Sequence, residues 1–157
     1  MVKKIRAALV VLLIAGVLVA GYAGYRLFTE EPPAHGPAVS RTTGTTDDGW
    51  QQVTYRGVDL EVPPNWERLD TSICASAPER WGPLGLDPCA PDAGLWFRAS
   101  ATFDPATGPG VHSAPASVNL PDGGWTGYVT RGDVVVDVAD ADQAVVRRIL
   151  QSVSEDV

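Results

Sequence analysis

The chain has few of the residues on which most catalytic and metal sites depend. Its 157 residues include two histidines, two cysteines, one methionine and no lysine after Lys4. From Glu30 onward nineteen acidic residues stand against eight arginines, an excess of eleven negative charges. A nucleic-acid groove or a polybasic lipid-binding surface needs the opposite balance, so the sequence excludes both. It also predicts no metal site and no cofactor, because a zinc site needs several Cys or His ligands.

Charge is missing altogether from one stretch near the N-terminus. Three basic residues precede the nineteen uncharged residues Ala7–Tyr25. At about 1.5 Å of rise per residue such a helix is roughly 28 Å long, close to the roughly 30 Å hydrocarbon core of a bilayer. Basic residues before a span favour the cytoplasmic side. The sequence therefore predicts residues 1–6 in the cytoplasm, a single-pass membrane anchor at 7–28 and the rest of the chain outside the cell.

A cleaved export signal is the alternative to an anchor. The small residues around Ala23 suit a signal peptidase, and cleavage there would give a secreted protein. The apolar region of a signal peptide usually has only about 7 to 15 residues, which favours retention. No cysteine lies near this point, which excludes a lipoprotein anchor. Small residues at Gly16, Ala20 and Gly24 line one helix face and could pair two helices in a homodimer, although such residues are common in membrane spans.

Beyond the predicted anchor the sequence divides into a tether and a domain. Residues 29–49 are rich in Pro, Thr, Gly and acidic residues, which is typical of a flexible tether. Residues 50–157 suffice for one small extracytoplasmic domain. Two cysteines in an exported domain most simply pair, so we expect a disulfide between Cys74 and Cys89. A redox or zinc site, the alternative, usually has a Cys-x-x-Cys motif or further ligands.

Alternating apolar residues predict antiparallel strands. Gln51–Tyr55 and Val58–Val62 flank the turn Arg56-Gly57, in a register that puts Val53 opposite Leu60 on one apolar face. The proline pair that follows ends the second strand, since proline cannot donate a ladder hydrogen bond.

Further strands are expected in the second half of the chain. Gly94–Phe103 alternates apolar and polar side chains, which predicts a half-buried strand. Trp125–Thr130 and Asp133–Val138 predict a second hairpin about Arg131-Gly132. The long loop before this hairpin could hold a short strand at Ser117–Leu120.

A helix is predicted at the C-terminal end. Asp140 is a good N-cap and Gln143 follows three residues later, which gives a start typical of a capping box for a helix through Val153. The apolar stripe consists of Val145, Val146, Ile149, Leu150 and Val153. The residues expected to face away are Arg147, Arg148 and Gln151. The predicted fold class is α+β, with an N-terminal transmembrane helix, a mainly antiparallel sheet, the C-terminal helix packed on it and one disulfide.

Two short motifs carry a resemblance to known proteins. The strand that runs into proline and tryptophan, Val58–Trp66, and the closing helix segment Ile149–Val153 resemble small exported actinobacterial domains of unknown function. More loosely, they are similar to PsbP-like proteins, which form an α-β-α sandwich. Where the PsbP-like pattern places a helix after the tryptophan, this chain has a proline-rich cysteine loop. The resemblance implies a binding or assembly role and no catalysis, and it carries over no functional residue.

Candidate catalytic residues are sparse. A secreted hydrolase using His112 with Ser113 is the weakest hypothesis, because adjacent side chains rarely present triad geometry and no serine has the glycines of a nucleophile elbow. No pair of carboxylates stands out among the many acidic residues. Arg131-Gly132-Asp133 spells an adhesive tripeptide, but a polar glycine turn explains it fully.

Tryptophan, by contrast, is abundant, with five in the chain. Exposed indole rings stack on sugar faces or anchor protein interfaces. We expect Trp50, Trp66 and Trp125 in the core, and Trp96 on the polar face of its strand. The alternative is that the cysteine loop folds over Trp96 and buries it. The hypothetical binding patch comprises Trp81, Trp96, Arg98 and Tyr128.

These observations together favour a binding or interaction domain over an enzyme. The predicted protein is held at the membrane by its N-terminal helix and binds a protein or a cell-wall glycan outside the cell. A carbohydrate or cell-wall binding module that uses Trp81 and Trp96 is the first alternative. The secreted hydrolase is the second.

Overall fold

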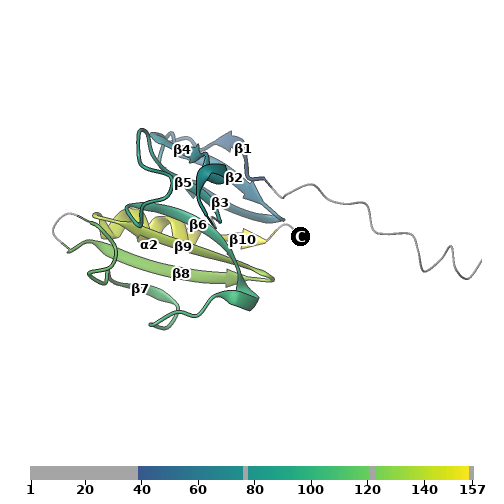
Figure 1. Ribbon diagram of the computed structural model, residues 1–157. Helices are drawn as coiled ribbons and strands as arrows, with labels where there is room; N and C mark the ends of the chain where they lie inside the picture. Colours follow the sequence, from purple (N-terminus) through teal and green to yellow (C-terminus); the bar gives the residue numbers. More distant parts are fainter. Residues whose placement is uncertain (1–38, 76–77, 121–122, 156–157) are drawn as a thin grey trace, which may run out of the picture. The chain divides into compact units, whose positions relative to one another are not determined.

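The computed structural model describes residues 39–75, 78–120 and 123–155, which belong to one compact unit, Ala38–Val157 (Figure 1). The predicted anchor at 7–28 and its stripe of Gly16, Ala20 and Gly24 lie outside the described residues. Within the described ranges, no helix is both long enough and apolar enough to cross a membrane.

One of two antiparallel sheets is built around the first predicted hairpin. Its strands, in spatial order, are β1 (Arg41–Thr45), β2 (Gln51–Tyr55), β3 (Val58–Val62) and β10 (Ser154–Glu155). The predicted register is confirmed, since Tyr55 pairs with Val58 and Val53 with Leu60. Both turn residues have positive φ, 50° at Arg56 and 73° at Gly57, as a two-residue hairpin turn requires.

Strand β1 corrects the predicted tether. Arg41–Thr45 was expected to be flexible but pairs antiparallel with β2, from Arg41 opposite Thr54 to Thr45 opposite Gln51. The strand is exposed and polar, so its ladder of backbone hydrogen bonds holds it in place and no apolar pattern reveals it. The folded domain therefore begins before residue 50.

The second sheet has six strands and carries most of the chain. In spatial order these are β4 (Trp66–Leu69), β5 (Glu79–Pro83), β6 (Gly94–Ala99), β9 (Val134–Asp140), β8 (Trp125–Arg131) and β7 (Gly110–Ser113). Short 3₁₀ helices at Thr71–Ile73 and Ser100–Thr102 follow β4 and β6. The disulfide between Cys74 and Cys89 is confirmed, and strand β5 lies within the loop that it closes.

Three sequence predictions need correction in this sheet. Strand β6 ends at Ala99, not Phe103, because a 3₁₀ turn follows. The second hairpin turns one residue later than expected, with Arg131 opposite Val134. Each residue thereby gains a partner two positions further along, and since side chains alternate with a period of two, every side chain stays on the same face of the sheet. Residues 117–120 form no strand, and the edge strand is β7 instead.

Helix α2 (Gln143–Ser152) packs with the predicted stripe inward. Its N-cap is Asp142, whose side chain accepts from the amide of Ala144, and not Asp140. Asp140 ends β9 and accepts from the amide of Asp142 at 2.8 Å. Gly127 in β8 leaves no room for a side chain, because a Cβ there would clash with the backbone carbonyl of Gly110 in β7 and lie 2.8 Å from the Cδ1 of Leu150 on the helix.

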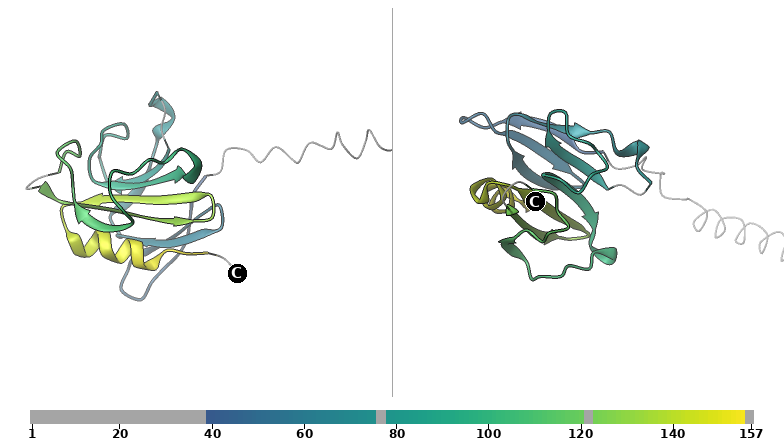
Figure 2. Two further views of the ribbon diagram at one scale, coloured as in Figure 1. Left: turned by 90° about the horizontal axis from the view of Figure 1, so that it is seen from below. Right: turned by 60° about the vertical axis from the view of Figure 1, so that its left-hand side comes forward.

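The core lies on one face of the six-stranded sheet. The four-stranded sheet and α2 both cover that face, as the two views of Figure 2 show. The rings of Tyr55 and Phe97 stack across the two sheets with centroids 4.4 Å apart. The predicted α+β architecture is therefore confirmed for the described domain, with two sheets where the sequence indicated one. Loops lie against the opposite face of the six-stranded sheet, here called the outer face.

Candidate binding site

Four polar or aromatic side chains form a row across the outer face. Arg80 of β5 is opposite Trp96 of β6, Trp96 is opposite Asp137 of β9, and Asp137 is opposite Tyr128 of β8. Directly opposite residues of antiparallel strands share a face, so the row follows from the register alone. Arg98 lies two residues along β6 from Trp96 and belongs to the same face.

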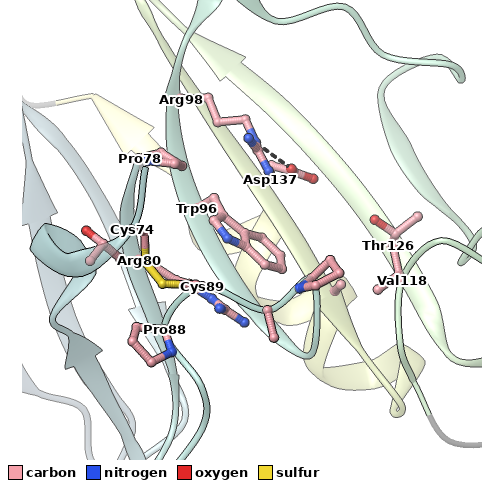
Figure 3. A pocket seen from close by; sticks show the side chains of 14 residues that line it. Cys74, Pro78, Arg80, Pro88, Cys89, Trp96, Arg98, Val118, Thr126 and Asp137 are labelled. Atoms are coloured by element: carbon pink, nitrogen blue, oxygen red, sulfur yellow. Dashed lines mark hydrogen bonds and ion pairs between the residues drawn. A yellow bond between two sulfur atoms is a disulfide. The ribbon is translucent and has the colours of Figure 1, made fainter. Parts of the chain in front are cut away.

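Trp96 lies between two guanidinium groups. The Cζ of Arg80 is 4.7 Å and the Cζ of Arg98 is 5.6 Å from the indole centroid. Both distances are within the range of cation–π attraction, which fixes the orientation of the ring. Figure 3 shows the indole with Arg98 and Asp137 on one side and Arg80 with the disulfide on the other. The side chain of Trp96 is only partly buried, so part of its ring remains accessible.

Arg80 is a buried residue with 1 % of its surface exposed. Its Nη1 donates to the carbonyl of Asp87 at 2.9 Å and its Nη2 to the carbonyl of Ala93 at 3.0 Å. Burial lowers the pKa of its guanidinium. Gly94 makes room for it, because a Cβ at that position would lie 3.3 Å from the Arg80 Nε and 2.7 Å from the carbonyl oxygen of Trp81. Arg80 thus holds the loop after β5 against the sheet.

Arg98 and Asp137 form an ion pair beside the tryptophan. The Arg98 Nε donates to Asp137 Oδ2 at 2.8 Å, and the two side chains are 37 % and 19 % exposed. Burial raises the pKa of the Asp137 carboxyl, and the charge of Arg98 opposes that rise. Within the described residues this is the one hydrogen bond of either side chain. The terminal amino groups of Arg98 and Oδ1 of Asp137 are therefore available to a ligand.

These groups line a pocket of about 250 Å³. Its floor is the sheet, with Trp96, Arg98, Asp137, Thr126 and Ala139. Its walls come from loops and comprise Thr71, Cys74, Pro78, Pro88, Cys89, Ala90, Pro91 and Val118 (Figure 3). Four of the wall residues lie in the cysteine loop or carry its disulfide bond, so this loop stands beside Trp96 and does not bury it.

The loop that contains Pro91 and the loop that contains Val118, which both form walls of the pocket, are joined to each other. The amide of Asn119 donates to the carbonyl of Pro91 at 3.0 Å, and its Nδ2 donates to Asp92 Oδ1 at 3.0 Å. With the disulfide and the Arg80 hydrogen bonds, both loops are fixed at several points. The pocket is therefore largely preformed, as is usual for ligand sites.

The prediction of Trp81 as a patch residue is wrong. Trp81 lies on the core face, 4 % exposed, because it neighbours Arg80 in β5 and successive side chains point to opposite faces. Its Nε1 donates to Ser40 Oγ at 2.7 Å, and that hydroxyl donates to Glu79 Oε1. Trp81 therefore ties the chain just before β1 to the sheet, a structural role.

Tyr128 lies on the outer face as predicted but outside the pocket lining. Its ring contacts Phe103 edge-on at 5.0 Å, and its hydroxyl donates to the carbonyl of Thr107 at 3.2 Å. The structure thus brings together three of the four patch residues on one face, with Trp96 and Arg98 in the pocket.

His112 makes a single contact of note, a hydrogen bond of 2.8 Å between its Nε2 and the carbonyl of Gly108. Ser113 follows it in β7, so their side chains point to opposite faces of the sheet. The geometry therefore does not pair them. In residues 39–75, 78–120 and 123–155 no three His, Cys, Asp or Glu side chains cluster in a way that could hold a metal ion.

Sequence reasoning missed Arg80 and Asp137. Asp137 carries a visible signal, since it interrupts the valine-rich run of β9 with a carboxylate. Arg80 carries none, because its strand shows no alternation and its neighbour Trp81 is the more conspicuous residue. Comparisons with models of protein families, with curated proteins and with solved structures give no match. The function must therefore be argued from the site.

Proposed function

We propose that the protein is a membrane-anchored extracytoplasmic binding domain and that the pocket around Trp96 is its binding site. The observation that carries this proposal is the partly exposed indole of Trp96, held between two arginines at the floor of a preformed pocket. Proteins usually bury or cover so large an aromatic ring, and exposed tryptophans held in place by neighbours are enriched at binding sites.

The location of the pocket also supports binding. It lies on the sheet face away from the core, so the side chains that line it are not required to hold the two sheets together. The disulfide that fixes its wall is the kind of bond that persists outside the cytoplasm. The uncharged segment Ala7–Tyr25 supports the membrane location.

Site-specific photocrosslinking in intact cells tests the proposal. The full chain carries p-benzoylphenylalanine either at Val118, on the pocket wall, or at Arg147, exposed on α2. We expect a discrete crosslinked species from position 118 only, in the membrane fraction, and its loss when Trp96→Ala is added. Trp96→Phe, which keeps an aromatic ring, should retain it in part.

Two outcomes would contradict the proposal. Identical products from positions 118 and 147, or a product at 118 that survives Trp96→Ala, would show that the pocket is not the binding site. Protein recovered from the medium with Gly24 as its first residue would overturn the anchor and leave a secreted binding domain.

A further inference from the structure

We infer that the pocket binds one pyranose ring of a saccharide, stacked on Trp96 and hydrogen-bonded by Arg98 and Asp137. This inference rests on the proposed function and specifies the ligand of the same site. It combines three features of the pocket, namely its size, its aromatic floor and the arrangement of its free donors and acceptors.

The volume restricts the ligand to about one ring. Pockets that enclose drug-sized ligands have roughly 300 to 1,000 Å³, whereas this one has about 250 Å³. Its walls of proline and cystine are fixed by the disulfide and by the hydrogen bonds of Asn119, so it cannot readily widen. A folded protein surface could insert only one side chain, and a long apolar chain would not fit.

The polar groups beside Trp96 match neighbouring hydroxyl groups. A hydroxyl both donates and accepts, and a ring sugar presents two of them on adjacent carbons. Arg98 offers its terminal amino groups as donors, and Asp137 offers Oδ1 as an acceptor. The two groups lie side by side, because Arg98 Nε is only 2.8 Å from Asp137 Oδ2. A purely apolar ligand would displace water from these groups without pairing them, which costs binding free energy.

The pocket offers a ligand a carboxylate acceptor as well as arginine donors. Asp137 lies in the floor row directly opposite Trp96, where it would repel a carboxylate or phosphate that approached the ring. Arg80 also lines the pocket, but its two terminal amino groups donate to the carbonyls of Asp87 and Ala93. The remaining side chains of the lining are threonine, alanine, valine, proline and the disulfide, which carry no charge. A neutral, hydroxyl-rich ring satisfies the donors of Arg98 and the acceptor of Asp137 together.

Binding of soluble oligosaccharides to the full chain in detergent micelles tests this inference. The probes are tetramers of glucose, of N-acetylglucosamine and of galacturonic acid, followed by isothermal titration calorimetry. We expect at least one neutral tetramer to bind with millimolar affinity or better. Trp96→Ala should weaken binding at least about tenfold through loss of stacking, and Arg98→Gln by about tenfold through loss of charged donors.

Matched variants separate binding from folding. Tyr128→Phe changes the same face outside the pocket lining and should bind like the wild type. Arg98 is 37 % exposed, so Arg98→Gln should fold normally even if Trp96→Ala does not, and it keeps the inference testable. Far-ultraviolet circular dichroism and the midpoint of urea unfolding verify that each variant is folded.

The outcomes distinguish this inference from the proposed function. If no tetramer binds at 10 mM, or if only the acidic tetramer binds and Trp96→Ala leaves it unchanged, the saccharide inference is wrong. If no tetramer binds but position 118 still gives a Trp96-dependent crosslink, the pocket binds a ligand of another class and the proposed function stands. Failure of both experiments would overturn both.

Discussion

Arg80 and Trp81 are neighbours in β5, but their side chains lie on opposite faces of the sheet and donate to different partners. Arg80 donates to two loop carbonyls on the outer face, whereas Trp81 donates to Ser40 on the core face. The first residue shapes the pocket and the second holds the start of the folded domain. The buried Trp81 therefore has a structural role, whereas Trp96 lines the pocket.

The hydrogen bond between Trp81 and Ser40 is expected to contribute measurably to stability. Trp81→Phe removes the indole donor and should lower the free energy of unfolding by about 1 kcal/mol, with a further loss from the smaller ring. Ser40→Ala should cost more, because it also removes the hydrogen bond from the Ser40 hydroxyl to Glu79. The double variant should lose less than the sum, because both single changes remove the bond between Trp81 and Ser40. Urea unfolding of the four proteins measures this, and strictly additive losses would show that the bond contributes nothing.

At the scale of elements, the cysteine loop is a wall of the pocket and also contains a strand. Strand β5 pairs with β4 on one side and β6 on the other, while the ends of the loop are joined at Cys74 and Cys89. Because β5 is hydrogen-bonded on both edges, the sheet does not depend on the disulfide for its register. The disulfide instead restricts the unfolded chain and fixes the loop that stands beside Trp96.

Removal of the disulfide should therefore destabilise the domain without changing its fold. The double variant Cys74→Ser, Cys89→Ser is expected to lose about 3 kcal/mol, the chain-entropy value for a loop of about 15 residues. Circular dichroism of the folded protein should be unchanged. Dithiothreitol should shift the urea midpoint of the wild type toward that of the variant and leave the variant itself unaffected. A variant as stable as the oxidised wild type would contradict this account.

The elements that sequence alone predicted are those with a strong local pattern. The hairpin around Arg56-Gly57 and the stripe of α2 bury alternate or periodic apolar residues, so their faces could be assigned. Strand β1 buries almost nothing and β4 has no alternation, so neither left a local signal. The site could not be predicted from local patterns alone. Trp96 and Arg98 share a strand, but Arg80 and Asp137 lie beside them only because the strand order is β5-β6-β9-β8.

At the scale of the whole molecule, Arg148 links parts of the domain distant in sequence. From α2 it donates to Glu61 of β3 at 2.8 Å and to Asp48, in the turn between β1 and β2, at 3.0 Å. Its guanidinium also lies 3.9 Å from the ring centroid of Trp50. The sequence predicted that Arg148 faces away from the core, and its side chain is 34 % exposed, but it also joins the helix to β3 and to the turn between β1 and β2.

Two carboxylates of the domain should affect its acid stability in opposite ways. Hydrogen bonds from Arg148 and Thr46 hold the pKa of Asp48 well below its usual range, whereas burial raises the pKa of Asp140. A lowered folded-state pKa gives stability that is present above the unfolded-state pKa of about 4 and is lost as the pH falls further. A raised folded-state pKa has the opposite effect, a cost at neutral pH that disappears as the pH falls through that pKa.

Replacing each carboxylate with its amide tests this opposition. At pH 7 we expect Asp48→Asn to unfold at lower urea concentration than the wild type and Asp140→Asn to unfold at higher concentration. Both differences should shrink as the pH approaches 3. Asp140 becomes neutral in the folded protein, whereas Asp48 stays ionised there and loses part of its stabilising effect because the unfolded state binds the proton first. Added salt should reduce the effect of Asp48→Asn more strongly, because salt screens the exposed ion pair between Asp48 and Arg148. The raised pKa of Asp140 comes from burial, which salt screens much less. Two variants that move the midpoint in the same direction at pH 7 would show that hydrogen bonding and burial do not dominate at these two sites.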